Sequence, residues 1–219
     1  MPKGVRTDRI SARDVEVLGF IARFGIVPRT AVAKWAGTGR TVTLTRERRL
    51  REAELVEVRS GVGGQSKLLT CTRAGLRFSG HGDLRTARFS LATVWHESAV
   101  AELAAELERG GDRTLSEREI LAEERAHGEL VYSAELPGGR LHRADLIRAA
   151  DGPSPEAIEV ELAAKAATRL DELLRAWRRA VAEGRLGGVG YRCGPRIGRV
   201  VRRAVDRTRT ASAISVEEL

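Results

Sequence analysis

The sequence predicts a mixed chain of the α+β or α/β class with two domains, and three observations carry that prediction. Charge is segregated: residues 1–80 hold 16 Lys and Arg against 7 Asp and Glu, residues 81–175 hold 12 against 19, and residues 176–219 hold 10 against 4. The first block reads as helices followed by two strands, and the rest alternates helices with strands. A length of 219 residues accommodates two small domains. We therefore expect domains at 1–80 and 81–219.

The first block is predicted to begin with three helices. Ser11 and Asp14 have capping-box spacing ahead of a run of apolar residues at helical intervals. Residues 30–37 form a short second helix that ends at a glycine. Residues 41–53 form a third helix, in which we expect Val42, Leu50 and Ala53 to face the core and the arginines at 46, 48, 49 and 51 to stay solvated.

Two strands and a glycine-rich turn follow the third helix. LVEVRS alternates like a strand, GVGGQS supplies a turn, and KLLTCT reads as the returning strand. Three helices and a hairpin in this order are typical of a winged helix-turn-helix domain, in which the third helix lies in the DNA major groove and the wing touches the backbone or minor groove. The candidate DNA-binding residues are Arg40, Thr41, Thr43, Thr45, Arg46, Arg48 and Arg49 on the third helix, with Arg59 and Lys67 beside the wing tip.

The charge balance supports the same partner. The first block has a net charge of +9, which favours a polyanion such as double-stranded DNA. Winged-helix proteins often pair two half-sites, so a homodimer is expected. No apolar run approaches the length of a membrane span and no signal segment stands at the start, so we expect a cytoplasmic protein without a membrane partner. The two cysteines, Cys71 and Cys193, are isolated and do not suggest a zinc site.

Acidic residues gather on two predicted strands of the second block. The segment LHRADLIRAA reads as a strand with Asp145 in its middle, DGPSP as a turn, and EAIEVEL as a second strand. Glu159 and Glu161 alternate on that strand, so both side chains leave the same face, and Lys165 follows. Convergent carboxylates are costly unless a cation or a proton neutralises them.

The segment HRADLIRAADGPSPEAIEVELAAK resembles the core of the PD-(D/E)xK nuclease-like fold. The resemblance implies a restriction-endonuclease-like mixed sheet, in which acids hold Mg²⁺ and a lysine activates water in active members. The chain departs from that pattern: Glu161 occupies the lysine position, Lys165 is displaced by four residues, and Arg143-Ala144 replaces the usual proline. We therefore expect a non-catalytic domain.

Across nearly the whole chain, RRLREAELVEV, TRAGL, ADLI and IEVELAAK together resemble the replication-relaxation family. That resemblance implies winged-helix DNA binding and a role in bacterial plasmid or phage replication or mobilisation, with a replication or transfer protein as a further partner.

Two functions remain open at this point. The first is a sequence-specific double-stranded DNA-binding protein without a cofactor, acting as a transcriptional regulator or as a replication and mobilisation accessory. The alternative is a metal-dependent DNA nuclease or nicking accessory. In that alternative Asp145, Glu159 and Glu161 bind Mg²⁺ and Lys165 is the catalytic cation.

Overall fold

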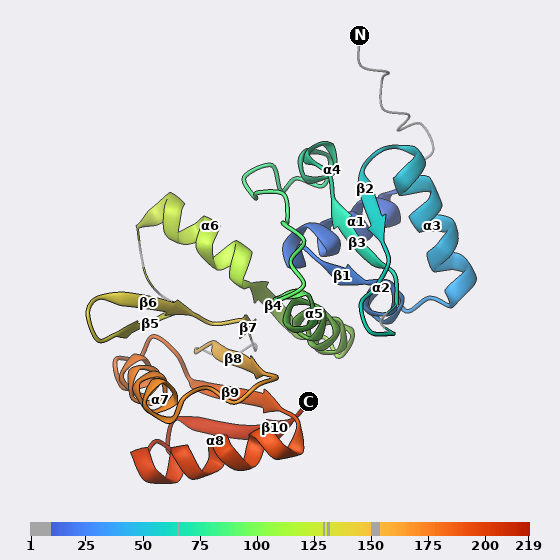
Figure 1. The fold of residues 1–219 in the computed structure, drawn as a ribbon. Helices are drawn as coiled ribbons and strands as arrows, with labels where there is room; N and C mark the ends of the chain where they lie inside the picture. The colour runs from blue at the N-terminus through green and yellow to red at the C-terminus, as the bar shows by residue number, and fades with distance from the viewer. Residues whose placement is uncertain (1–9, 65, 129, 131, 150–153) are drawn as a thin grey trace. The chain divides into compact units, whose positions relative to one another are not determined.

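The computed structural model describes residues 10–64, 66–128, 130, 132–149 and 154–219, and is a mixed α+β fold (Figure 1). It divides into two compact units, Met1–Gly111 and Asp112–Leu219. The sequence placed the boundary near residue 80. The difference arises from one helix, α5 (Val94–Arg109), which packs against α2 and β1 and so belongs to the first unit.

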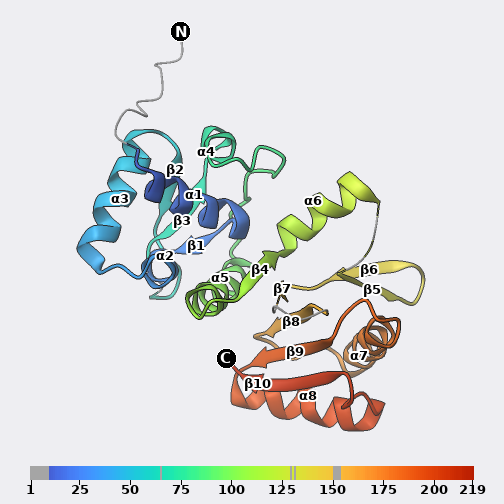
Figure 2. The ribbon, with the colours of Figure 1, turned by 180° about the vertical axis from the view of Figure 1, so that it is seen from behind.

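The first unit begins with the predicted capping box. The Ser11 side chain accepts from the backbone N–H of Asp14, and the Asp14 carboxylate accepts from the backbone N–H of Ser11. The elements that follow are α1 (Ala12–Phe24), β1 (Val27–Pro28), α2 (Arg29–Ala36) and α3 (Arg40–Glu52). Figures 1 and 2 show α3 on the outside of this unit, with no other described element of the unit over its outer face.

The predicted hairpin is present after α3. Its strands, β2 (Val56–Arg59) and β3 (Leu68–Cys71), are antiparallel, and β1 adds a third strand in the order β1-β3-β2. A short helix, α4 (Arg73–Phe78), comes next. A Cβ on its buried Gly75 would lie 2.0 Å from the carbonyl oxygen of Leu55. This close approach sets α4 against the start of the hairpin.

The second unit is built on a five-stranded mixed sheet in the order β10-β9-β8-β7-β4. Neighbours are antiparallel from β4 to β8 and parallel from β8 to β10. Helices α7 and α8 pack together against β9 and β10, and a separate hairpin joins β5 to β6. The elements are β4 (Arg113–Ser116), α6 (Glu117–His127), β5 (Ser133–Leu136), β6 (Arg140–Arg143), β7 (Leu146–Ala149), β8 (Glu156–Glu161), α7 (Ala167–Ala182), β9 (Gly188–Cys193), α8 (Pro195–Thr208) and β10 (Ile214–Glu218).

The segment predicted as one strand around Asp145 is two strands. β6 pairs with β5, β7 pairs with β4 and β8, and Asp145 lies at the bend between them. The chain changes sheets at this bend, which an alternating pattern of side chains does not reveal. Most of the predicted DGPSP turn, residues 151–153, lies outside the described residues.

Candidate nucleic-acid interface

Helix α3 is held to its unit by a mostly polar face. Its buried residues are Thr43, Glu47 and Leu50. The Thr43 hydroxyl donates to the carbonyl oxygen of Gly39 at 3.1 Å. The Glu47 carboxylate accepts two hydrogen bonds from Arg29 of α2, at 2.5 and 2.8 Å. This bidentate pair joins α2 to α3 with a geometry that only an arginine fork provides.

The opposite face of α3 is open to solvent. Thr41, Thr45 and Arg48 are exposed and share one stripe, because they are separated by four and three residues. Arg40 and Arg51 are also exposed. The stripe therefore presents one guanidinium and two hydroxyls, which are groups that can form hydrogen bonds with base edges and phosphates.

Two apolar side chains flank this stripe. Val42 is 45% exposed and Leu44 is 36% exposed. The prediction that Val42 faces the core is wrong, because the buried face runs through Thr43 and Glu47 instead. Sequence reasoning missed both as candidate ligand contacts, since an apolar residue on a helix is ordinarily assigned to the core.

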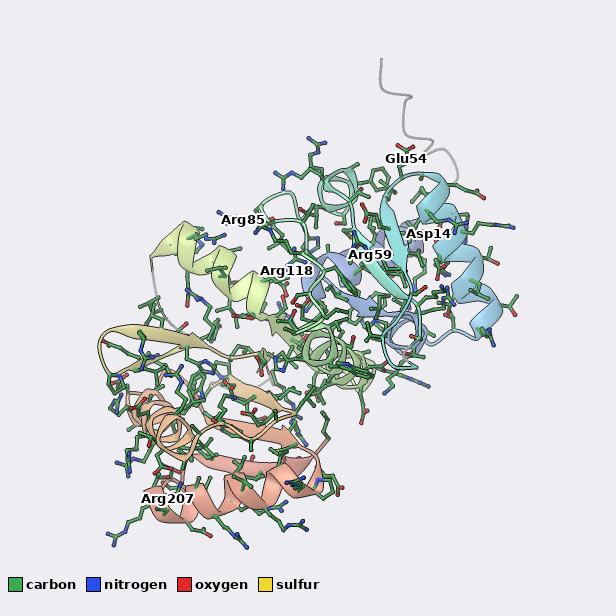
Figure 3. The ribbon with its side chains drawn as sticks, viewed as in Figure 1. Asp14, Glu54, Arg59, Arg85, Arg118 and Arg207 are labelled. Atoms are coloured by element: carbon green, nitrogen blue, oxygen red, sulfur yellow. The ribbon has the colours of Figure 1, made fainter. Side chains whose placement is uncertain are left out.

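Two of the predicted arginines face inward rather than outward. Arg46 and Arg49 each place an Nη1 atom 3.2 Å from the carboxylate of Asp14, whose side chain is completely buried. Asp14 itself is labelled in Figure 3. The expectation that these arginines stay solvated is therefore wrong. A buried carboxylate requires counter-charges, and α3 supplies both. Among the predicted contacts on α3, this leaves Arg40, Thr41, Thr45 and Arg48 outward and Thr43 buried.

The two basic residues of the hairpin, Arg59 and Lys67, are exposed. Arg59 pairs with Glu57 at 3.0 Å, and its guanidinium lies 5.5 Å from the ring centre of Phe89. Lys67 donates to the Ser60 hydroxyl at 2.9 Å. Both side chains are therefore at the surface of the unit, where a bound polyanion could reach them.

The tip of the hairpin contacts α5. A Cβ on Gly63 would lie 2.7 Å from the Trp95 ring, and Gly63 has a φ of +57°. The glycine thus permits both the turn and the contact. Trp95 is 45% exposed, because this contact covers only part of its ring.

Acidic residues of α5 are engaged by α1 and α2. Glu108 accepts from the Trp35 indole at 2.6 Å and pairs with Arg23 at 2.8 Å, and Glu106 lies 3.4 Å from the Lys34 ammonium. Trp35 also stacks on Phe20, with 5.1 Å between ring centres. These carboxylates of α5 are therefore bound by side chains of α1 and α2.

The three acids of the second unit that were predicted as a site are each held by a different neighbour. Asp145 accepts from the backbone N–H of Val160 at 2.8 Å, and Glu161 pairs with Lys165. Glu159 is buried and lies 2.9 and 3.0 Å from Nε2 of His142. Sequence reasoning missed His142, because nothing in its local sequence marks a partner 17 residues away.

Burial raises the pKa of Glu159 above its ordinary value, and the Asp145 charge adds to that rise although His142 opposes it. Burial also raises the pKa of Tyr191, which pairs with Glu159 across the β8–β9 register. Within the described part of the chain, no three His, Cys, Asp or Glu side chains are arranged to hold a metal ion.

Comparison with known proteins identifies no relative. No family model, no curated protein and no solved structure matches this chain. Among the residues that the structure describes, no helix has both the length and the apolar character needed to cross a membrane.

Proposed function

We propose that the chain binds double-stranded DNA through the outward face of α3, which enters the major groove, with the β2–β3 hairpin as a wing on the backbone. In this proposal the unit that ends at Gly111 is a winged helix-turn-helix domain extended by α5. The observation that supports it most directly is the exposed stripe of Thr41, Thr45 and Arg48 on an outer helix. A helix with side chains is about 10–12 Å across, which fits a major groove about 12 Å wide.

The exposed face of α3 carries two kinds of side chain that suit DNA. Arg40, Arg48 and Arg51 supply charge for phosphates or a fork for guanine. The two threonines and the exposed Val42 and Leu44 supply hydroxyls and apolar surface, which suit adenine or cytosine edges and the thymine methyl. Arg46 and Arg49 act as positioning residues through Asp14.

The second unit completes the proposal as a non-catalytic partner domain. Its mixed sheet supports the PD-(D/E)xK-like assignment, and its acids serve structure: Glu159 binds His142, and Glu161 binds Lys165. We further propose a homodimer that pairs two half-sites. Sedimentation at micromolar concentration tests it, and a monomeric mass both with and without a palindromic duplex would refute it.

The cellular role is proposed as transcriptional regulation or as a plasmid or phage replication and mobilisation accessory of the replication-relaxation type. Selection of genomic fragments bound by the purified chain separates the two roles. Enrichment of promoters supports the regulator, and enrichment of a replication or transfer origin supports the accessory. A replication or transfer protein is a proposed partner only in the second case.

The DNA-binding proposal is tested with the variant R40Q/R48Q/R51Q. Because each phosphate contact contributes about 0.9 to the slope of log affinity against log salt, the variant should lose up to about 2.7 from that slope. The matched control is R77Q/R109Q/R125Q, which removes three exposed arginines from α4, α5 and α6. Fluorescence anisotropy with a duplex several turns long measures the affinity and its salt slope for each protein. Equal affinity and slope for the folded variant and the wild type would refute the assignment.

A further inference from the structure

The outer face of α8 carries a line of arginines without carboxylate partners. Arg196, Arg199 and Arg203 are exposed, and no ion pair involves them in the described part of the chain. Spacings of three and four residues place them on one stripe, and Arg207 extends it by one more turn. At about 1.5 Å per residue the stripe from Arg196 to Arg207 is about 17 Å long, which is about half of one turn of duplex DNA.

The opposite face of α8 is committed to its own unit. Gly198, Val201, Ala204, Val205 and Thr208 are buried, and the helix packs against β9, β10 and α7. The arginine stripe is therefore fixed in orientation by a buried apolar face rather than being part of a solvated tail. Figure 3 labels Arg207 at the end of this helix.

Neighbouring contacts add further charge to one end of the stripe. Arg207 and Arg175 both contact Asp171, at 2.5 and 3.9 Å, so one carboxylate is shared by two cations. Arg178 of α7 reaches the carbonyl oxygen of Arg209 at 3.3 Å. Residues 195–209 contain six arginines and one acid, Asp206.

Like charges at i and i+4 destabilise a helix by a few tenths of a kcal/mol per pair. A face that only had to remain solvated would be more stable with acids interleaved, as on α6. Residues 196–203 contain no acid, and the three arginines of the stripe in this stretch fit a polyanion whose charges are regularly spaced and that arginine can bind in bidentate fashion.

We propose that this face of α8 is a second, sequence-independent binding surface for the phosphate backbone of double-stranded DNA. The choice of DNA as the polyanion rests on the proposed function, although the surface is separate from α3. A membrane surface fits less well, because an interfacial helix inserts an apolar face and that of α8 is buried against the sheet. Phosphate contacts carry no sequence information, so the surface adds affinity equally for every duplex.

Four full-length proteins test the proposal: the wild type, the α3 variant R40Q/R48Q/R51Q, the α8 variant R196Q/R199Q/R203Q, and the combination of both. Anisotropy with a duplex of arbitrary sequence is measured at several salt concentrations. In the α3-variant background, the α8 substitutions should lower the salt slope by up to about 2.7, which corresponds to as much as about a 500-fold loss of affinity at 0.1 M salt. The R196K/R199K/R203K protein keeps its charge and should keep most of the slope. Thermal melting verifies that each protein is folded.

Residual duplex binding that is the same with and without the α8 arginines would overturn this inference, as would the absence of residual binding in the α3 variant. If the α8 substitutions abolish duplex binding and the α3 substitutions have no effect, the proposed function is overturned and this inference stands. A wild type that binds no duplex overturns both. Retention on phosphatidylserine vesicles that depends on the α8 arginines, without any effect on duplex binding, would assign the surface to a membrane instead.

Discussion

The Nη1 atom of Arg46 lies 3.2 Å from Oδ1 of the fully buried Asp14, so an arginine of the candidate recognition helix is bound to the first turn of α1. Arg49 reaches the other carboxylate oxygen at the same distance. Asp14 also accepts from the Ser11 backbone in the capping box. One carboxylate therefore stabilises the start of α1 and fixes the orientation of α3.

Asp14→Asn should destabilise the first unit by about 3 kcal/mol, because removing one partner of a buried ion pair leaves the other charges uncompensated. Urea unfolding followed by circular dichroism measures the change. Asp83→Asn, which alters an exposed acid of the same unit, is the control and should shift the midpoint little. An unchanged midpoint for the Asp14 variant would contradict the role given to this carboxylate.

Arg46→Gln and Arg48→Gln should separate stability from DNA affinity. The Arg46 side chain is 15% exposed against Asp14, whereas that of Arg48 is 66% exposed and only 3.8 Å from the equally exposed Glu52. We expect Arg46→Gln to lower the midpoint of unfolding and Arg48→Gln to leave it within about 0.5 kcal/mol of the wild type. Duplex affinity of the folded proteins should fall with Arg48→Gln. The reverse pattern would exchange the roles of the two residues.

The Arg29–Glu47 pair should show strong coupling in a double-mutant cycle. Two charge-assisted hydrogen bonds join the side chains, and Glu47 is buried. Unfolding free energies of Arg29→Gln, Glu47→Gln and the double variant should give an interaction of about 2 kcal/mol. Additive single effects would mean that the pair does not hold α2 to α3.

Gly63→Ala should disturb the hairpin tip in two separable ways. The added methyl would overlap the Trp95 ring at 2.7 Å, and a φ of +57° costs an L-residue about 1–2 kcal/mol. In a Trp95→Ala background only the backbone cost remains, so Gly63→Ala should be less destabilising there. Thermal melting of the four proteins measures this. An equal cost in both backgrounds would show that the tip does not rest on Trp95.

Stability of the second unit should fall as the pH rises through the folded-state pKa of His142. Burial lowers this pKa, but the charge and hydrogen bond of Glu159 outweigh burial and raise it above 6.5, with Asp145 adding to the rise and Lys165 opposing it. A raised histidine pKa adds stability that is complete below the unfolded-state pKa and is lost above the folded-state value. Glu159, whose pKa is raised by burial, acts in the same direction because the folded state holds its proton more tightly.

His142→Gln should therefore flatten the dependence of unfolding free energy on pH between about pH 6 and pH 8. Urea unfolding at several pH values supplies the comparison. A wild-type stability that increases across this range, relative to the variant, would have the opposite sign to the one expected from the pair.

Local sequence signals predicted much of the secondary structure. The capping box at Ser11, the first three helices and the hairpin all occur, because each depends on residues close together in the chain. The buried face of α3 could not be predicted in this way. Glu47 and Arg46 are polar, and their partners lie 18 and 32 residues away. The same limit applies to Asp145, where the chain leaves one sheet for another.

The close approach at Gly75 has a consequence for variation of the chain. Because any side chain there would occupy the space of the Leu55 carbonyl, a saturation library selected for folding should retain glycine alone at this position. Added or deleted residues between Leu55 and Gly75 are tolerable only where the backbone faces solvent, at the tip around Gly64. Length polymorphism among descendants of this sequence should therefore concentrate at the tip of the β2–β3 hairpin.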